Sequence, residues 1–323
     1  MHKRPLPVVL VIVAALFAPV LTGCAPRSVI ADLFPDPALA TCVAEALGVD
    51  DPGETVSDDA LEEVYTLSCG IDRPIIAELA EREDARAEGE DTDPDDLAAV
   101  PADAIVDLTG LERLTFLAAV DLTGNAVVDL RPLADHEKLG RLALTNNQVS
   151  DLTPLRNLPV LNDLGLSGNR LRDISPLADL TGLRFLGLAD NAIEDLTPLA
   201  PLAGLTELDV SGNRVTDLAP MSGLLQLNRL TASRNGVHDV SPLAALPVLV
   251  MLDVSGNAIE DTTAFVGFPV LDELWLGGNP LTDVSQLRDL PALLGVDFEG
   301  SEWSTIAGLD DLEADGVYVG GFA

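Results

Sequence analysis

The chain has 323 residues and is strongly acidic, with 53 Asp and Glu against 18 Lys and Arg and a formal net charge of −35 at pH 7. This charge argues against nucleic acid as a partner, because nucleic-acid-binding surfaces neutralise phosphates with basic side chains. The sequence also lacks the hydrolase, metalloprotease, phosphate-loop and dinucleotide motifs of common enzyme chemistry. We therefore expect neither an enzyme nor a protein that holds a cofactor or a metal.

Residues 1–23 have the composition of a cleaved export signal. Lys3 and Arg4 make its start basic, and the stretch from Val8 to Val20 is apolar but short for a membrane span. The mature chain is therefore expected outside the cytoplasm.

The signal ends in the tetrapeptide Leu21-Thr22-Gly23-Cys24. This tetrapeptide resembles the lipobox of bacterial lipoproteins, in which the cysteine thiol is lipidated and the cysteine becomes the first mature residue. The resemblance implies a lipid anchor on Cys24 in the bacterial cell membrane, with residues 24–32 as a short tether. The alternative is an ordinary secretory signal that precedes a free cysteine.

Two cysteines remain once Cys24 is assigned to the anchor. Cys42 and Cys69 both lie before the repeats described below. An even number of cysteines in an exported chain predicts a disulfide, which would stabilise a small N-terminal unit by about 3 to 4 kcal/mol in the chain-entropy model. The other possibility is two unpaired cysteines in a core.

Residues 72–101 are set apart by their composition. The apolar residues Ile75, Ile76 and Leu79 fit one edge of a short helix, and the stretch from Glu88 to Asp96 is almost wholly acidic. We expect a solvated acidic insertion.

Three aspartates of this insertion, Asp91, Asp93 and Asp95, alternate as at the start of a calcium-binding loop. Two further requirements of such a loop fail. Asp96 stands where the tight turn needs glycine, and Ala102 stands where a bidentate glutamate should complete the site. A plain acidic loop is favoured over a calcium site.

Eight asparagines recur at intervals of 22 residues with no insertion or deletion between them, and apolar residues keep fixed offsets around each one. A unit of this length cannot bury its own apolar face, so each coil must cover its neighbour and the chain forms a solenoid. We number the positions of each coil from its first leucine, which is Leu161 in one coil and makes Asn169 position 9. The asparagines are Asn125, Asn147, Asn169, Asn191, Asn213, Asn235, Asn257 and Asn279.

Each coil is expected to hold one short strand and one short return segment. Positions 4 to 6 alternate apolar, exposed, apolar, the pattern of a strand with one face in the core. The asparagine then turns the chain, and stacked coils would align its amides in a hydrogen-bonded ladder. An aspartate at position 13 and a proline at position 16, such as Asp173 and Pro176, favour a 3₁₀ return segment capped by the aspartate.

This pattern resembles the leucine-rich repeat proteins, in the 22-residue subclass typified by the bacterial internalins. The resemblance implies an α/β repeat solenoid over residues 102–312, with a parallel sheet on the concave face and 3₁₀ or irregular return segments outside. Asp103 and Ser301 mark degenerate coils at its two ends. Residues 33–71, which begin Leu-Phe-Pro-Asp-Pro, resemble the helical N-terminal cap of such proteins, and residues 313–323 form the C-terminal end.

The exposed face of the sheet is the candidate functional site. Positions 2, 3, 5, 7 and 8 point away from the core, so stacked coils align them in columns. Aromatic and arginine side chains are typical of binding hot spots, and the competing interpretation is that these are scattered exposed residues with no joint function. The candidates are Arg141, Phe185, Asp209, Arg229, Met251, Asp253 and Trp275.

The histidines that follow the signal, His136 and His238, do not indicate catalysis. His136 occupies a leucine position and His238 an exposed one, and four to five coils separate them. At about 4.8 Å per strand they cannot share one site.

The leading hypothesis is a lipid-anchored extracytoplasmic protein that binds a protein or peptide through its concave face. Arg156 and Arg288, in return segments, are expected to be neutral for that binding. The alternative is a structural envelope component, in which the repeats act as a spacer and the acidic surface attracts cations or a cationic polymer.

Overall fold

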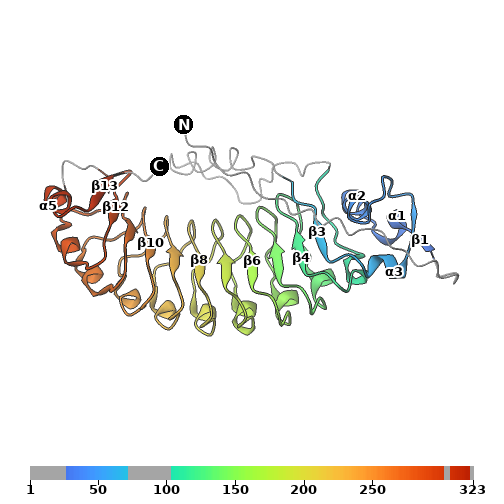
Figure 1. The fold of residues 1–323 in the computed structure, drawn as a ribbon, viewed down its shortest axis with the longest axis horizontal. Coiled ribbons are helices and arrows are strands. Elements are labelled where there is room, and N and C mark those ends of the chain that lie inside the picture. Colours follow the sequence, from blue (N-terminus) through green and yellow to red (C-terminus); the bar gives the residue numbers. More distant parts are fainter. Residues whose placement is uncertain (1–26, 72–102, 302–305, 321–323) are drawn as a thin grey trace.

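In the computed structural model, residues 27–71, 103–301 and 306–320 are described, and they form one arched solenoid (Figure 1). Strands line the inner side of the arch, and the return segments lie on its outer side. Among these described residues, no helix has both the length and the apolar character needed to cross a membrane. The predicted signal peptide, Cys24 and the whole acidic insertion, including its calcium-like aspartates, lie outside the described ranges.

A small helical unit begins the fold, as the resemblance to internalins predicts. Its elements are β1 (Arg27–Val29), α1 (Ile30–Leu33), α2 (Pro37–Ala46), β2 (Thr55–Ser57) and α3 (Asp58–Leu61), with β1 and β2 antiparallel. Helix α2 begins where it does because Pro37 is set for the first turn and Asp36 caps the helix.

The remaining strands form one parallel sheet of 11 strands in sequence order. Adjacent strands pair in register, so equivalent positions of neighbouring coils lie side by side. Each observed strand covers positions 3 to 5, one residue earlier than predicted, because the backbone pairs around the buried residue at position 4. The strands are β3 (Thr66–Ser68), β4 (Ala119–Asp121), β5 (Arg141–Ala143), β6 (Asp163–Gly165), β7 (Phe185–Gly187), β8 (Glu207–Asp209), β9 (Arg229–Thr231), β10 (Met251–Asp253), β11 (Glu273–Trp275), β12 (Gly295–Asp297) and β13 (Tyr318–Gly320).

Short 3₁₀ segments return the chain on the outer side, as the proline position predicts. Proline stands in the first turn of many of them, and the aspartate at position 13 accepts a hydrogen bond from the backbone N–H two residues later, as Asp151 does from Thr153 at 2.8 Å. The segments are η1 (Leu111–Arg113), η2 (Arg131–Leu133), η3 (Thr153–Leu155), η4 (Ser175–Asp179), η5 (Thr197–Leu199), η6 (Ala219–Met221), η7 (Ser241–Leu243), η8 (Thr263–Gly267) and η9 (Ser285–Asp289), followed by the helix α5 (Leu309–Ala314).

The core is a stack of leucine columns that runs through the whole arch. In the coil that begins at Leu161, the side chains of Leu164, Leu166, Leu171 and Leu177 are all buried, and the neighbouring coils repeat the arrangement. Burying one such side chain contributes roughly 1.5 to 3 kcal/mol. The core therefore continues from coil to coil without a break between separate domains.

The asparagine at position 9 holds each coil to the one before it. The side-chain amide of Asn191 donates to the carbonyl of Leu166 in the previous coil and of Leu188 in its own, both at 3.0 Å. Its oxygen accepts the N–H of Leu171 at 2.9 Å. The same contacts recur in the other coils, as at Asn147, so one side chain satisfies backbone groups of two coils.

The chain turns in a left-handed conformation at position 8, just before each asparagine. Glycine meets this need in most coils, but Asp190 and Arg234 also have positive φ, at 53° and 51°. The Arg234 guanidinium reaches across the intervening coil to the Asp190 carboxylate at 2.8 Å. Gly212 lies between them, and a Cβ atom there would overlap the Asp190 carboxylate, so a larger residue would displace the Asp190 side chain from this ion pair.

The acidic insertion lies within the first coil, not between the cap and the array as we predicted from the sequence. Strand β3 precedes the insertion yet pairs with β4. The N–H of Ile71 bonds Thr123, as position 8 does elsewhere, and the N–H of Ile105 bonds Asn125, as position 11 does. Residues 66 and 119 begin β3 and β4, 53 residues apart. Subtracting the 31 residues from 72 to 102 leaves 22, so the insertion enters at the turn.

The disulfide predicted from the cysteine count is present between Cys42 and Cys69, with a Cα–Cα distance of 5.6 Å. Cys69 directly follows β3 and takes the core position that leucine fills in other coils. The bond therefore joins helix α2 to the first coil of the array, and not two parts of a separate cap.

Asp36 makes a second connection between the helical unit and the first coil. Its Oδ1 accepts the N–H groups of Ala38 and Leu39 at the start of α2, at 2.9 and 3.1 Å. Its Oδ2 accepts those of Val106 and Asp107, at 2.8 and 3.1 Å. One carboxylate, 8% exposed, thus links segments on either side of the insertion.

Candidate functional site

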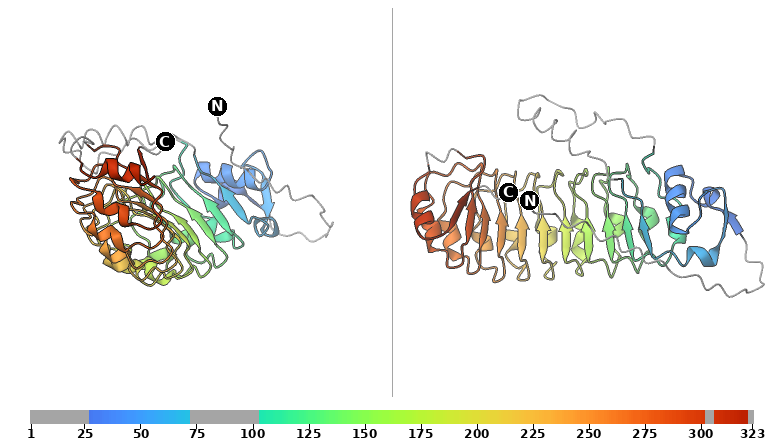
Figure 2. Two further views of the ribbon diagram at one scale, coloured as in Figure 1. Left: turned by 60° about the vertical axis from the view of Figure 1, so that its left-hand side comes forward. Right: turned by 45° about the horizontal axis from the view of Figure 1, so that its top comes forward.

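Positions 3 and 5 of each coil, which are the two ends of its strand, form the inner surface of the arch. Their side chains flank the buried residue at position 4, and the right-hand view of Figure 2 shows the strands side by side along this face. Because the strands pair in register, position 3 of one coil lies beside position 3 of the next, about 4.8 Å away. The concave surface is therefore a grid of two side-chain columns.

The structure brings four of the predicted site residues together. Arg229, Met251 and Glu273 are neighbours in the position 3 column, and Thr231, Asp253 and Trp275 are neighbours in the position 5 column. We call the group Arg229, Met251, Asp253 and Trp275 the concave patch. Met251 and Trp275 are partly exposed and lie outside the buried leucine columns.

The other predicted residues lie progressively farther from the concave patch. Asp209 lies on β8, next to β9, while Phe185 lies on β7, two strands from Arg229. The Phe185 ring is 44% exposed. Arg141 lies on β5 and forms an ion pair with Asp163 at 3.3 Å, so it is not part of the same cluster.

Phe185 stands beside the flattest part of the concave face. Position 5 is glycine on both β6 and β7, at Gly165 and Gly187, and alanine on β5, at Ala143. The hydroxyls of Thr145 and Ser167 lie 3.3 and 3.1 Å from where Cβ atoms of Gly165 and Gly187 would be, so small polar groups adjoin the strand of Phe185. The glycines by themselves define no ligand.

Sequence reasoning passed over Glu207 and Glu273 as site residues. Glu273 lies beside Met251 in the position 3 column, and Glu207 lies between Phe185 and Arg229. Both carboxylates are exposed. The signal was available in the sequence: aligning positions 3 and 5 of adjacent coils places each residue beside its neighbours once the 22-residue register is known.

Carboxylates on the outer side accept hydrogen bonds from the return segments. The hydrogen bonds from the hydroxyl and the N–H of Thr153 hold the pKa of Asp151 below its usual range, and Ser241 does the same for Asp239. For Asp129, the hydrogen bond from the Arg131 side chain is the main cause of a lowered pKa. These aspartates therefore accept hydrogen bonds from the start of each return segment in their charged form.

The two arginines that we expected to be neutral for binding make ion pairs on the outer side. Arg156 lies 3.3 Å from Asp179, and Arg288 lies 2.8 Å from Asp315, which ends helix α5. Exposed pairs of this kind contribute about 0 to 1 kcal/mol. Arg288 also holds the C-terminal helix, so Arg172, exposed after the turn of its coil, is a cleaner control position.

The histidines show no catalytic arrangement. His136 is buried, and its Nε2 lies 3.0 Å from the carbonyl oxygen of Leu111, so it packs as a core residue at its leucine position. His238 is exposed in another part of the array. Within the described ranges, no group of three or more His, Cys, Asp or Glu side chains could hold a metal ion.

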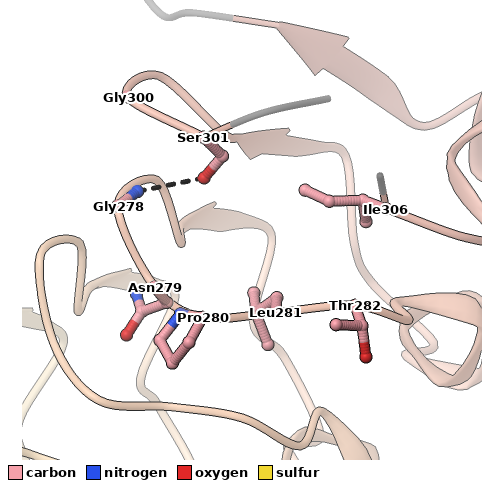
Figure 3. A pocket seen from close by; sticks show the side chains of 8 residues that line it. All are labelled: Gly278, Asn279, Pro280, Leu281, Thr282, Gly300, Ser301 and Ile306. Atoms are coloured by element: carbon pink, nitrogen blue, oxygen red, sulfur yellow. Dashed lines mark hydrogen bonds between the residues drawn. The ribbon is translucent and has the colours of Figure 1, made fainter. Parts of the chain in front are cut away.

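The surface also has a hollow near the C-terminal end of the array (Figure 3). Its lining includes Gly278, Asn279, Leu281, Ser301 and Ile306, and none of the described residues that line it has a titratable side chain. Its polar groups already serve the repeat, because Ser301 Oγ accepts the Gly278 N–H at 3.0 Å and the Asn279 amide donates to Val254 and Leu276. Ser301 thus stands at the asparagine position where the array ends. The polar groups of the hollow are used to hold the coils together.

Comparisons with known proteins agree with this geometry. Residues 159–201 match the family model described as leucine-rich repeats in two copies. An internalin C2 from Listeria monocytogenes is 30% identical, with 84% of this chain and 97% of that chain covered and a TM-score of 0.58. The chain is an internalin-like leucine-rich repeat protein.

Two further solved internalins show how far the likeness extends. The internalin InlF from Listeria monocytogenes is 28% identical over 92% of this chain and 78% of that chain, with a TM-score of 0.76. The functional domain of InlJ from the same organism is 25% identical over 85% of this chain and 57% of that chain, with a TM-score of 0.58. A search among curated proteins found no match. The internalin-like architecture thus includes the helical unit as well as the repeats.

Proposed function

We propose that this internalin-like protein is a lipid-anchored extracytoplasmic receptor that binds a protein or peptide on its concave face. The observation that carries the proposal is the concave patch with Phe185 nearby. These side chains lie on a rigid sheet, and neither the core nor the asparagine ladder requires them. Aromatic and arginine side chains on a pre-formed surface are the usual anchors of protein interfaces.

The acidic character of the chain supports partner binding in preference to nucleic-acid binding. A formal charge of −35 repels phosphate backbones. Catalysis has no support, since the described part of the chain brings together no nucleophile, general base and orienting group.

Anchoring is supported by the sequence and by where the fold begins. The lipobox-like tetrapeptide ends at Cys24, and β1 begins at Arg27. Three residues span at most about 11 Å when extended. An anchor on Cys24 would therefore hold the helical end of the arch close to the membrane. The link is shorter than the tether we predicted over residues 24–32, because β1 and α1 begin within that range.

A second function is favoured by the charge alone. The position 13 aspartates form an exposed column along the outer surface, and they could attract a cationic polymer in a structural envelope component. Such an association would weaken steeply as added salt shortens the Debye length, whereas a fitted interface with apolar anchors would keep most of its affinity.

The experiment that tests the proposed function is site-specific crosslinking in the intact envelope. A photoreactive phenylalanine analogue, which keeps an aromatic ring at the site, replaces Phe185 in one variant and Arg172 in a matched variant on the outer side. We expect a discrete polypeptide to be captured through position 185 at moderate salt, and not through position 172. Capture of the same material through both positions, lost at high salt, would favour the structural alternative.

A further inference from the structure

Apolar and acidic side chains alternate where strands β10 and β11 pair on the concave face. We call the four residues Met251, Asp253, Glu273 and Trp275 the checkerboard. Met251 and Asp253 occupy positions 3 and 5 of β10, and Glu273 and Trp275 occupy the same positions of β11. In-register pairing places Met251 beside Glu273 and Asp253 beside Trp275. The thioether and the indole therefore lie on one diagonal, and the two carboxylates lie on the other.

The two carboxylates keep acceptor capacity for a ligand. Both hydrogen bonds that Asp253 accepts, from the N–H and the hydroxyl of Ser255, use Oδ1, at 2.9 and 2.7 Å. Those bonds fix the carboxylate while Oδ2 takes no hydrogen bond from any described residue. The Glu273 side chain is exposed and, among the described residues, forms no ion pair.

The surroundings reinforce the negative charge. Positions 3 and 5 of β8 to β11 carry the acids Glu207, Asp209, Asp253 and Glu273 and the single base Arg229, so 1 minus 4 gives a charge of −3. Arg229 is separated from Glu273 by the Met251 strand. The local charge has the same sign as the whole chain, which would draw a cationic partner toward this face.

We infer that this checkerboard receives a lysine or arginine side chain of the partner polypeptide. The methylenes of such a side chain pack on Met251 and Trp275, and its cationic head lies between Asp253 and Glu273. The indole adds attraction for a cation over its face. This inference rests on the proposed function, which it deepens by specifying the partner's chemistry: a basic side chain on the polypeptide.

The test uses the full chain in detergent micelles and a randomised dodecapeptide library displayed on phage. Selected peptides are synthesised with a fluorescent label and titrated by anisotropy. Each basic residue of the peptide is replaced in turn by norleucine. The affinity of each peptide is measured for the wild-type protein and for the double variant Asp253→Asn with Glu273→Gln. The Asn and Gln side chains keep the shape of the site, and Asn keeps an acceptor for Ser255. The double variant Glu260→Gln with Asp289→Asn, both sites exposed outside the concave columns, removes the same charge.

We expect the peptide to contain one basic residue whose replacement by norleucine weakens binding to the wild-type protein at least tenfold. The same replacement should leave binding to the Asp253→Asn with Glu273→Gln variant unchanged, as direct contact requires in a double-mutant cycle. The Glu260→Gln with Asp289→Asn control should behave as wild type. Equal norleucine effects in wild type and the concave double variant would overturn the inference. If Trp275→Ala abolishes binding in that case, the proposed function stands; if peptides bind Trp275→Ala as tightly as wild type, both fail.

Discussion

At the scale of one residue, the stability of the fold depends strongly on each ladder asparagine, because one side chain bonds backbone groups of two coils. We expect Asn191→Leu to lower the melting temperature sharply, because it leaves the Leu171 N–H without its acceptor. It also removes one of the two asparagine amides that donate to each of the Leu166 and Leu188 carbonyls. Each buried unsatisfied group costs about 1 to 3 kcal/mol. Thermal unfolding followed by circular dichroism measures the effect.

Ser301→Leu provides the comparison for that variant. Ser301 occupies the same position in the degenerate coil at the end of the array and accepts one hydrogen bond, from Gly278, so its replacement should lower the melting temperature much less. Equal melting temperatures for Asn191→Leu and wild type would show that the ladder does not hold the coils together.

The stability of the fold also depends strongly on the side chain of Asp36. Asp36→Ala removes the acceptor of four backbone N–H groups, two in α2 and two in the first coil, and we expect a loss of about 2 to 4 kcal/mol in the free energy of unfolding. Urea unfolding measures this loss. Asp51→Ala is the matched control, since Asp51 is exposed and accepts only the Gly53 N–H. Similar losses for both variants would refute the role assigned to Asp36.

At the scale of the elements, the insertion at the first turn allows a direct test of the coil boundaries. We predict that deleting residues 72–102, which joins Ile71 to Asp103, restores a 22-residue coil and leaves the unfolding temperature close to that of wild type. Deletion of 70–102 should destabilise the first coil, because it also removes the Ile71 N–H bonded to Thr123. The boundaries are wrong if the shorter deletion unfolds the array, or if the two deletions are equally stable.

The sequence predicted the regular elements well because one period governs both the core and the turns. The buried column that contains Leu164 and the ladder that contains Asn169 follow from that period alone. The first coil escaped prediction because the 31 inserted residues break the period, although Val64, Leu67 and Cys69 already have the spacing of positions 1, 4 and 6. The one-residue shift of the strands reflects backbone pairing, which side-chain alternation does not report.

The candidate site was less predictable than the fold. The columns at positions 3 and 5 could be read from the sequence, and they contain Met251 and Trp275. Their grouping with Glu273 needed the in-register pairing of β10 and β11. The contacts of Asp36 could not be predicted, because its carboxylate reaches N–H groups 70 and 71 residues away, and such a contact depends on how the helical unit packs on the first coil.

At the scale of the whole molecule, the proposed anchor fixes the arch at its helical end. We expect the wild-type protein to partition into the detergent phase and Cys24→Ser to enter the aqueous phase or remain unprocessed. Phase partitioning with mass determination of the mature N-terminus checks this, and Cys42→Ser with Cys69→Ser is the control that removes cysteines without touching the anchor. Unchanged detergent partitioning of a correctly processed Cys24→Ser chain would reject lipid anchoring.

The arch presents one face to a partner, so the most direct measurement compares variants of its two faces. The polypeptide captured through position 185 is titrated against Trp275→Ala, Phe185→Ala and Arg172→Ala, each checked for an unchanged melting temperature. We predict that the first two weaken binding by about 2 kcal/mol or more, roughly 30-fold, and that Arg172→Ala changes the dissociation constant less than about twofold. Loss of binding in Arg172→Ala with full binding in Trp275→Ala and Phe185→Ala would contradict the assignment of the concave face.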